Sequence, residues 1–177
     1  LVISIGFAGA LQESLKVGDL LLAETLQPSD SPGEIRIDPE LMQQALRVPV
    51  PDGVSRIPGR LVTVGEPVSL PGKKQELGRR HSAQAVDMET APLARLAQEQ
   101  QLPFLSVRAI SDTLNQALFD ISPLLKPEGE VSPLKAGWFV LTHPGSLKSL
   151  VRLRDQAHRA RQNLTRFLSS WMATMTP

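Results

Sequence analysis

Two acidic side chains, Glu89 and Asp112, stand where two apolar segments of this chain end. Glu89 follows the apolar residues Ala85 and Val86, and Asp112 follows the apolar run 104–110. We expect both segments to be neighbouring strands, which would bring the two carboxylates to one edge of a sheet. Loops and helix N-termini converge at such an edge in α/β proteins, so a pair of carboxylates there indicates a binding or catalytic site.

The two carboxylates differ in their expected surroundings. Glu89 would stand at the start of a helix, where the helix dipole favours the ionised form, and it could accept hydrogen bonds from a pair of ligand hydroxyls. Asp112 would end a buried strand, where loss of water favours the protonated form and allows it to donate a proton. Two plainer roles stay open: Glu89 as a helix cap, and Asp112 as a turn residue that caps the segment after Ser111.

The segment from Gly6 to Ala10 is the third one expected at this edge, because its glycines permit close approach of the backbone. Arg108 and the cluster Arg79-Arg80-His81 are interpreted as solvated or ion-paired rather than catalytic. Met88, considered alone, is interpreted as a core residue.

Composition limits the classes of function. With 177 residues, 41% of them hydrophobic and 21% charged, the chain is predicted to form one globular domain, residues 1–177. A net charge of +1 gives no bulk attraction to nucleic acid and favours small-molecule chemistry. The chain has no cysteine and three scattered histidines, which argues against disulfides and metal sites and is compatible with a cytoplasmic protein. Its apolar runs are far shorter than the ~20 residues of a membrane span.

Strands and helices are predicted to alternate, which is typical of an α/β fold with a largely parallel or mixed sheet. The helix expected over 89–101 would place Leu93, Leu96 and Ala97 on one face, and the first strand is expected to break at its glycines. A surface excursion is expected over 28–58, and a polar connection from Asp112 to about Pro133. The strands are predicted at 1–5, 20–26, 60–65, from 86 and at 104–110, and the helices at 39–46, within 69–80, at 89–101 and at 146–172.

The chain opens with an apolar strand at Leu1 rather than with a polar lead-in. Since a domain seldom begins with a buried strand, we expect an N-terminal part of the natural protein to precede this chain.

Three motifs in this order resemble one known family: Gly-Phe-Ala-Gly-Ala-Leu at 6–11 with Val-Gly-Asp at 17–19, Val-Asp-Met-Glu-Thr-Ala at 86–91, and Val-Arg-Ala-Ile-Ser-Asp at 107–112. The family is the purine nucleoside phosphorylase and nucleosidase superfamily, and the methylthioadenosine/S-adenosylhomocysteine nucleosidase branch is the most similar. The resemblance covers about residues 1–115. It implies a mixed, barrel-like sheet flanked by helices, N-terminally truncated here, and cleavage of the N-glycosidic bond of nucleosides.

The resemblance also implies roles for individual residues. Asp112 would donate a proton to purine N7, with Ser111 supporting it. Glu89 would hold the ribose 2′-hydroxyl, and Met88 would pack against the sugar. The remaining expected substrate-binding residues are Phe7, Ala8 and Gly9 in the first motif, and Val68 and Ser69 beside the base.

Two departures from the family pattern stand out. Phe7 occupies a position where many members have a serine that helps to place phosphate or water, which weakens the case for a phosphorylase. The family's N-terminal strands, which carry the glutamate that activates water, have no counterpart here, so the chain is expected to lack its own general base.

Phe7 and the tail 144–157 also resemble the hopanoid-associated phosphorylase subgroup, whose members act on an adenosylated hopanoid lipid precursor. The C-terminal helix combines apolar and basic residues, and could therefore approach a membrane. A helix that packs on the core with a solvated basic face is the favoured alternative. Its apolar residues are Leu147, Leu150, Val151, Leu153, Ala157, Leu164, Phe167 and Trp171, and its basic ones are Lys148, Arg152, Arg154, Arg159, Arg161 and Arg166.

The first functional hypothesis is therefore an adenine-releasing nucleosidase that acts on adenosylhopane, methylthioadenosine or adenosylhomocysteine. The second is a phosphorylase, with phosphate as co-substrate, or a futalosine-hydrolase-like enzyme. The third is a truncated domain that binds nucleosides without turnover. The resemblance implies no metal or organic cofactor, no nucleic-acid partner and a homodimer.

Overall fold

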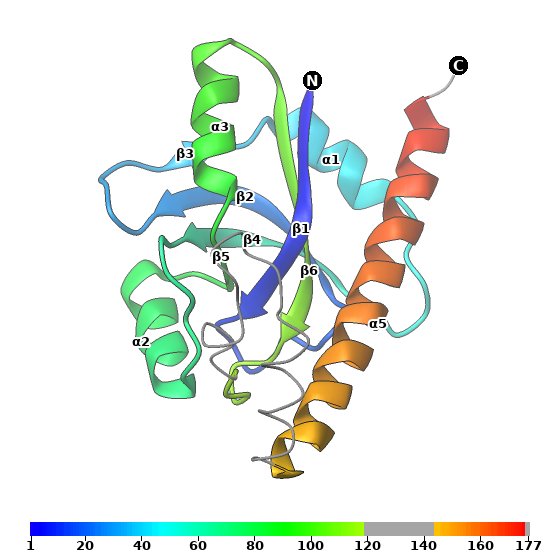
Figure 1. The fold of residues 1–177 in the computed structure, drawn as a ribbon. Helices are drawn as coiled ribbons and strands as arrows, with labels where there is room; N and C mark the ends of the chain where they lie inside the picture. Colours follow the sequence, from blue (N-terminus) through cyan, green and yellow to red (C-terminus); the bar gives the residue numbers. More distant parts are fainter. Residues whose placement is uncertain (119–143, 176–177) are drawn as a thin grey trace, which may run out of the picture.

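The computed structural model describes residues 1–118 and 144–175, and strands and helices alternate in it as predicted (Figure 1). The connection expected as far as Pro133 lies largely outside these residues. In chain order the elements are β1 (Val2–Ala10), β2 (Leu20–Pro28), β3 (Ile35–Arg36), α1 (Pro39–Arg47), β4 (Arg56–Thr63), α2 (Pro71–His81), β5 (Ala85–Asp87), α3 (Thr90–Glu99), β6 (Phe104–Asp112) and α5 (Pro144–Met175).

The six strands form one mixed sheet that closes on itself. Its order is β3-β2-β4-β5-β1-β6, and β2 also pairs with β6, so five strands form a ring to which β3 is added through β2. Strands β2, β4 and β5 run parallel to one another, whereas β1 and β6 run parallel to each other and antiparallel to their other neighbours. The predicted barrel-like mixed sheet is confirmed.

One expectation about the strands is wrong: the strands before Glu89 and at Asp112 are not direct neighbours. Strand β1 lies between β5 and β6 and pairs with both. Gly9 of β1 is in register with Val86 on one side and with Asp112 on the other. The two acidic segments therefore reach the same region because one short stretch of β1 joins them.

Strand β1 also does not break at its glycines but continues through Gly6 and Gly9 to Ala10. A Cβ atom on Gly6 would lie 2.5 Å from Nη1 of Arg108, and one on Gly9 would lie 3.0 Å from Oδ2 of Asp112. Glycine is needed at both positions because polar side chains of β6 lie close against the backbone of β1. The expectation of close approach is confirmed, and that of a break is wrong.

Helix α3 packs on the sheet through small side chains rather than through leucines. Ala91, Ala94 and Ala97 are buried, whereas Leu93 and Leu96, which we expected on the same face as Ala97, are exposed. A face of alanines lets the helix axis approach the sheet closely, which brings the start of α3 against the polar residues of β6.

The segment 28–58 is more ordered than a surface excursion. It holds β3, α1 and the start of β4, and α1 begins at the cap residue Asp38, whose Oδ1 accepts hydrogen bonds from the backbone N–H groups of Glu40 (2.8 Å) and Leu41 (3.1 Å). Met42 and Ala45 of α1 lie in the core.

Helix α5 packs along the barrel, in contact with β6 (Figure 1). Ala160, Leu164, Phe167 and Trp171 belong to the core, and the basic residues Arg152, Arg154, Arg159, Arg161 and Arg166 are exposed. The favoured alternative, a core-packing helix with a solvated basic face, is confirmed. Leu147, Lys148 and Leu150 lie outside the described side chains. Across residues 1–118 and 144–175, no helix has both the length and the apolar character that crossing a membrane requires.

Candidate active site

A cavity of about 330 Å³, which we call the small cavity, opens where β1, β5 and β6 end. This volume is at the lower end of the range for small-molecule sites, about 300–1,000 Å³. All the predicted site residues line the cavity except Ser69. Its lining is Gly6, Phe7, Ala8, Gly9, Val64, Pro67, Val68, Val86, Asp87, Met88, Glu89, Ser111, Asp112 and Leu118.

Ser69 contributes to the wall indirectly. Its carbonyl accepts a hydrogen bond of 2.9 Å from the backbone N–H of Leu118, which does line the cavity. This bond joins the segment before α2 to the segment after β6.

Glu89 is available to a ligand because another residue does the capping. It occupies the N-cap position of α3, but its side chain makes no capping hydrogen bond. Instead, Oδ2 of Asp87 accepts from the backbone N–H of Thr90 at 3.1 Å. Glu89 is exposed, and its carboxylate has no hydrogen bond or ion pair within the described part of the chain. The structure thus gives the capping role considered for Glu89 to Asp87.

Asp112 is buried, with both carboxylate oxygens held by other side chains. Ser111 Oγ donates to Oδ1 at 2.6 Å, as expected of a supporting residue, and the Lys74 ammonium donates to Oδ2. Lys74, which sequence reasoning missed, comes from α2 and is fully buried. The Asp112 side chain therefore belongs to an ion pair at the cavity wall and does not cap a turn.

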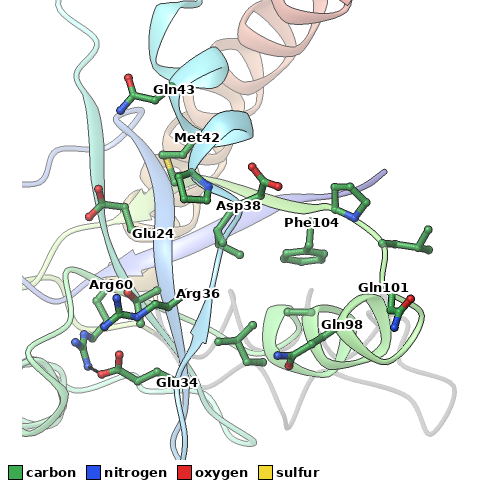
Figure 2. A pocket seen from close by; sticks show the side chains of 17 residues that line it. Glu24, Glu34, Arg36, Asp38, Met42, Gln43, Arg60, Gln98, Gln101 and Phe104 are labelled. Carbon is green, nitrogen blue, oxygen red and sulfur yellow. Dashed lines mark hydrogen bonds and ion pairs between the residues drawn. The ribbon is translucent and has the colours of Figure 1, made fainter.

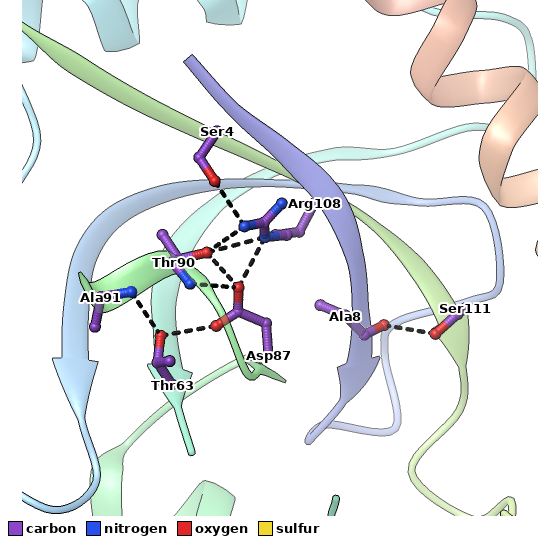
Figure 3. Close-up of polar contacts among 8 residues, drawn as sticks. All are labelled: Ser4, Ala8, Thr63, Asp87, Thr90, Ala91, Arg108 and Ser111. Atoms are coloured by element: carbon purple, nitrogen blue, oxygen red, sulfur yellow. Dashed lines mark hydrogen bonds and ion pairs between the residues drawn. The ribbon is translucent and has the colours of Figure 1, made fainter. Parts of the chain in front are cut away.

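A second buried ion pair lies behind the small cavity (Figure 3). Arg108 Nε donates to Oδ2 of Asp87 at 2.9 Å, and its Nη2 donates to Ser4 Oγ at 2.7 Å. Oδ1 of Asp87 accepts from Thr63 Oγ1 at 2.7 Å. Of the two interpretations of Arg108, the ion-paired one is confirmed and the solvated one is wrong. The network connects β1, β4, β5 and β6 below the start of α3.

One nitrogen of Arg108 is left over. Its Nη1 is buried and has no hydrogen-bond partner among the residues that the structure describes. The nitrogen lies against Gly6, which lines the small cavity. An unpartnered guanidinium nitrogen is a strong donor for a water or an anion held beside it.

The rim of the small cavity is apolar on one side. Phe7 and Met88 line it and remain 44% and 47% exposed. The interpretation of Met88 as a core residue is therefore wrong. These two side chains offer apolar surface to a ligand that extends out of the cavity.

The cluster Arg79-Arg80-His81 lies at the end of α2, away from the lining of the small cavity. Arg80 pairs with Glu76 at the surface, at 2.6 Å. Burial lowers the pKa of His81 from its ordinary value, and the positive charges of Arg80 and Arg60 lower it further. The solvated or ion-paired interpretation holds for Arg80.

A larger cavity of about 870 Å³, the large cavity, lies between α1, α3 and β3. Figure 2 shows Glu34 and Arg60 turned toward each other there, at 2.6 Å in an ion pair that is about one-third exposed. Asp38, also on its wall, is committed to the cap of α1. Its other charged residues, Glu24 and Arg36, are exposed, whereas the small cavity places a carboxylate beside two buried ion pairs, so the small cavity is the better candidate for chemistry.

Comparison with known proteins places the chain in a family. The model of the Phosphorylase superfamily matches residues 1–122. The 5′-methylthioadenosine/S-adenosylhomocysteine nucleosidase of Staphylococcus haemolyticus is 28% identical over 131 residues, which are 65% of this chain and 58% of the relative. The enzyme of the same name from Haemophilus ducreyi is 30% identical over 129 residues, or 63% of this chain and 55% of the relative. The chain thus spans somewhat under three-fifths of the length of these curated relatives.

Solved structures show the same likeness. The 5′-methylthioadenosine/S-adenosylhomocysteine nucleosidase of Campylobacter jejuni superposes with a TM-score of 0.60 at 26% identity, covering 69% of this chain and 60% of that one. The match to the futalosine hydrolase of Helicobacter pylori covers 98% of this chain and 67% of that chain, with a TM-score of 0.70. At 21% identity, this match shows a similarity of fold.

Proposed function

We propose that this chain, which belongs to the Phosphorylase superfamily, cleaves the N-glycosidic bond of an adenine nucleoside and releases adenine. The observation that carries the proposal is the pair of carboxylates at one cavity: Glu89, without a partner among the described residues, and Asp112, buried and oriented by two. The named activity of the relatives, nucleoside cleavage, supports it.

The two carboxylates suit the two ends of the scissile bond. When the bond between C1′ and N9 breaks, its electron pair leaves with the base, and a proton delivered to N7 makes the base a neutral leaving group. Asp112 is the acid that delivers this proton. Glu89 accepts hydrogen bonds from the ribose hydroxyls, the 2′-hydroxyl above all, and its negative charge stabilises the positive charge that develops on the sugar.

The proposed nucleophile is water. Nη1 of Arg108, which lies beside Gly6 and has no hydrogen-bond partner among the described residues, is the donor proposed to hold it. Phosphate is the second candidate, because a guanidinium nitrogen also favours an anion. Phe7 brings no hydroxyl to this side of the cavity, which favours water over phosphate.

The part of the 5′ substituent next to the sugar is proposed to be apolar. Phe7 and Met88 present apolar surface at the rim, where a methylthio group, a hopanoid group or the thioether chain of a homocysteinyl group would extend from the sugar. S-adenosyl-derived nucleosides therefore fit best: methylthioadenosine, adenosylhomocysteine or adenosylhopane. A futalosine-hydrolase-like activity is the alternative, supported by 28% identity to a futalosine hydrolase mutant of Helicobacter pylori over 63% of this chain.

The test is adenine release from methylthioadenosine, adenosylhomocysteine and adenosylhopane, each with and without phosphate. It is made on this chain and on a version extended at its N-terminus, since the curated relatives are longer. Release without phosphate supports a hydrolase, and release that requires phosphate supports a phosphorylase. Binding of adenine without release by either version would favour a nucleoside-binding domain and contradict the proposal. A homodimer remains a proposal, to be measured by light scattering on the same samples.

A further inference from the structure

Lys74 is the most unusual charged residue outside the proposed chemistry. Its side chain is fully buried, although it belongs to a polar helix, α2. The preceding residue, Lys73, is exposed. The three hydrogens of its ammonium group have three acceptors: Oδ2 of Asp112, the carbonyl of Thr113 at 3.0 Å and the carbonyl of Gln116 at 3.0 Å. Burial of a fully hydrogen-bonded ammonium is costly and seldom adds net stability, so its position beside a cavity calls for another explanation.

The position of Lys74 fixes that of the Asp112 carboxylate. Lys74 holds one oxygen from α2, and Ser111 holds the other from β6. Gly9 closes the third side, since a Cβ atom there would lie 3.0 Å from Oδ2. Only the remaining lone pairs of the carboxylate can then meet a ligand, and their direction is set by the protein rather than by the ligand.

Lys74 also ties Asp112 to the cavity wall. The two carbonyls that it binds belong to the segment after β6, which continues to Leu118 on the wall. The backbone bond from Leu118 to Ser69 returns this segment to the start of α2. Lys74 therefore joins the acid to the wall beside it through hydrogen bonds.

We infer that Lys74 is a positioning residue for proton delivery: its ammonium orients Asp112 and stabilises the carboxylate that Asp112 becomes when it protonates the leaving base. Asp112 first takes up a proton from solvent on a lone pair that neither Lys74 nor Ser111 occupies. In the transfer step that O–H bond breaks, the N7–H bond forms, and the electron pair of the O–H bond stays on Asp112 beside the positive charge of Lys74. The bond between C1′ and N9 breaks with its pair going to the base. The inference rests on the proposed function and names a group that acts through Asp112.

The deciding experiment compares two leaving groups. Adenine needs a proton in order to leave, whereas 4-nitrophenolate leaves a riboside as a stable anion without one. We expect Lys74→Met to lower kcat about 10²-fold on the adenine nucleoside and less than about 3-fold on 4-nitrophenyl riboside. Lys74→Arg should recover part of the loss, because it restores the charge. Lys73→Met is the matched control and should leave both rates unchanged.

A second measurement does not require turnover. Adenine and 7-deazaadenine differ at N7, and calorimetry on the unaltered chain should show preference for adenine. Lys74→Met should reduce that preference about 10-fold. Equal losses on both leaving groups, or on both bases, would make Lys74 merely structural and overturn the inference. If the unaltered protein neither releases nor binds adenine, the proposed function itself fails, and the inference fails with it.

Discussion

The two cavities of this molecule differ in what their charged side chains are free to do. In the large cavity, Glu34 and Arg60 pair with each other near the surface, Asp38 caps a helix, and Glu24 and Arg36 are exposed. At the small cavity, the ion pairs are buried. Glu89 on the wall and one nitrogen of Arg108 behind it have no protein partner among the described residues. If volume alone identified the functional site, the large cavity would be chosen, because its volume is about 870 Å³ and that of the small cavity is about 330 Å³. The comparison teaches that a candidate site is better recognised by a frame of buried ion pairs around its polar groups than by its size.

The largest expected effect is at the acid of the small cavity. Asp112→Asn should reduce the rate of adenine release about 10²-fold to 10⁴-fold, because an amide cannot supply the N7 proton. Adenine release under saturating substrate measures it, with circular dichroism to show that the variant is folded. A rate close to that of the unaltered protein would remove Asp112 from the mechanism.

The next effect concerns the frame behind the cavity. Asp87→Asn leaves Arg108 without its buried charge partner and should lower the free energy of unfolding by about 3–5 kcal/mol. Urea denaturation measures it. The double variant Asp87→Asn, Arg108→Met should lose less than the sum of the two single losses, because it leaves no unpaired charge. Additive losses would show that the two residues do not act as a pair.

A smaller effect is expected at Glu89. Glu89→Ala should reduce the preference for ribosides over 2′-deoxyribosides about 10-fold, the loss of one charged hydrogen bond. Stability should not change, since Glu89 does not cap α3. Ratios of kcat/KM for the two sugars measure the preference, with Glu89→Gln as the control that keeps an acceptor. An unchanged preference would exclude Glu89 from binding the 2′-hydroxyl.

The smallest effect is expected in the large cavity. Glu34→Gln removes a partly exposed ion pair and should change the free energy of unfolding by less than about 1 kcal/mol. Adenine release should be unaffected. A clear loss of activity in this variant would undo the contrast between the two cavities and point to a role for the larger one.

Part of the site could be predicted from residue types and their order. Glu89, Asp112 and the glycines of β1 stand at the ends or crossings of apolar strands, and periodicity reveals such positions. Asp87, close to Glu89, is the last residue of the buried strand β5, so the same signal indicates it without choosing between the two carboxylates.

Other parts depend on contacts between distant segments. Lys74 belongs to a polar helix in which most neighbours are exposed, so no periodic pattern marks it as buried. Arg108 interrupts an apolar strand, and only the fold brings Asp87 and Ser4 to it. The alternation of strands and helices was predictable. The order of the strands was not, because a strand as short as β5 has too few residues for its pattern to indicate which strands pair with it.

Closure of the ring has a consequence for the synthesis of this protein on the ribosome. Strand β6 pairs with both β1 and β2, although about a hundred residues separate β1 from it in the chain. The earlier strands therefore emerge with open edges, and the ring can close only after Asp112 has left the exit tunnel. Such non-local pairing slows folding and leaves the edges exposed to other chains in the meantime. The small cavity of the nascent chain is consequently among the last parts to be assembled.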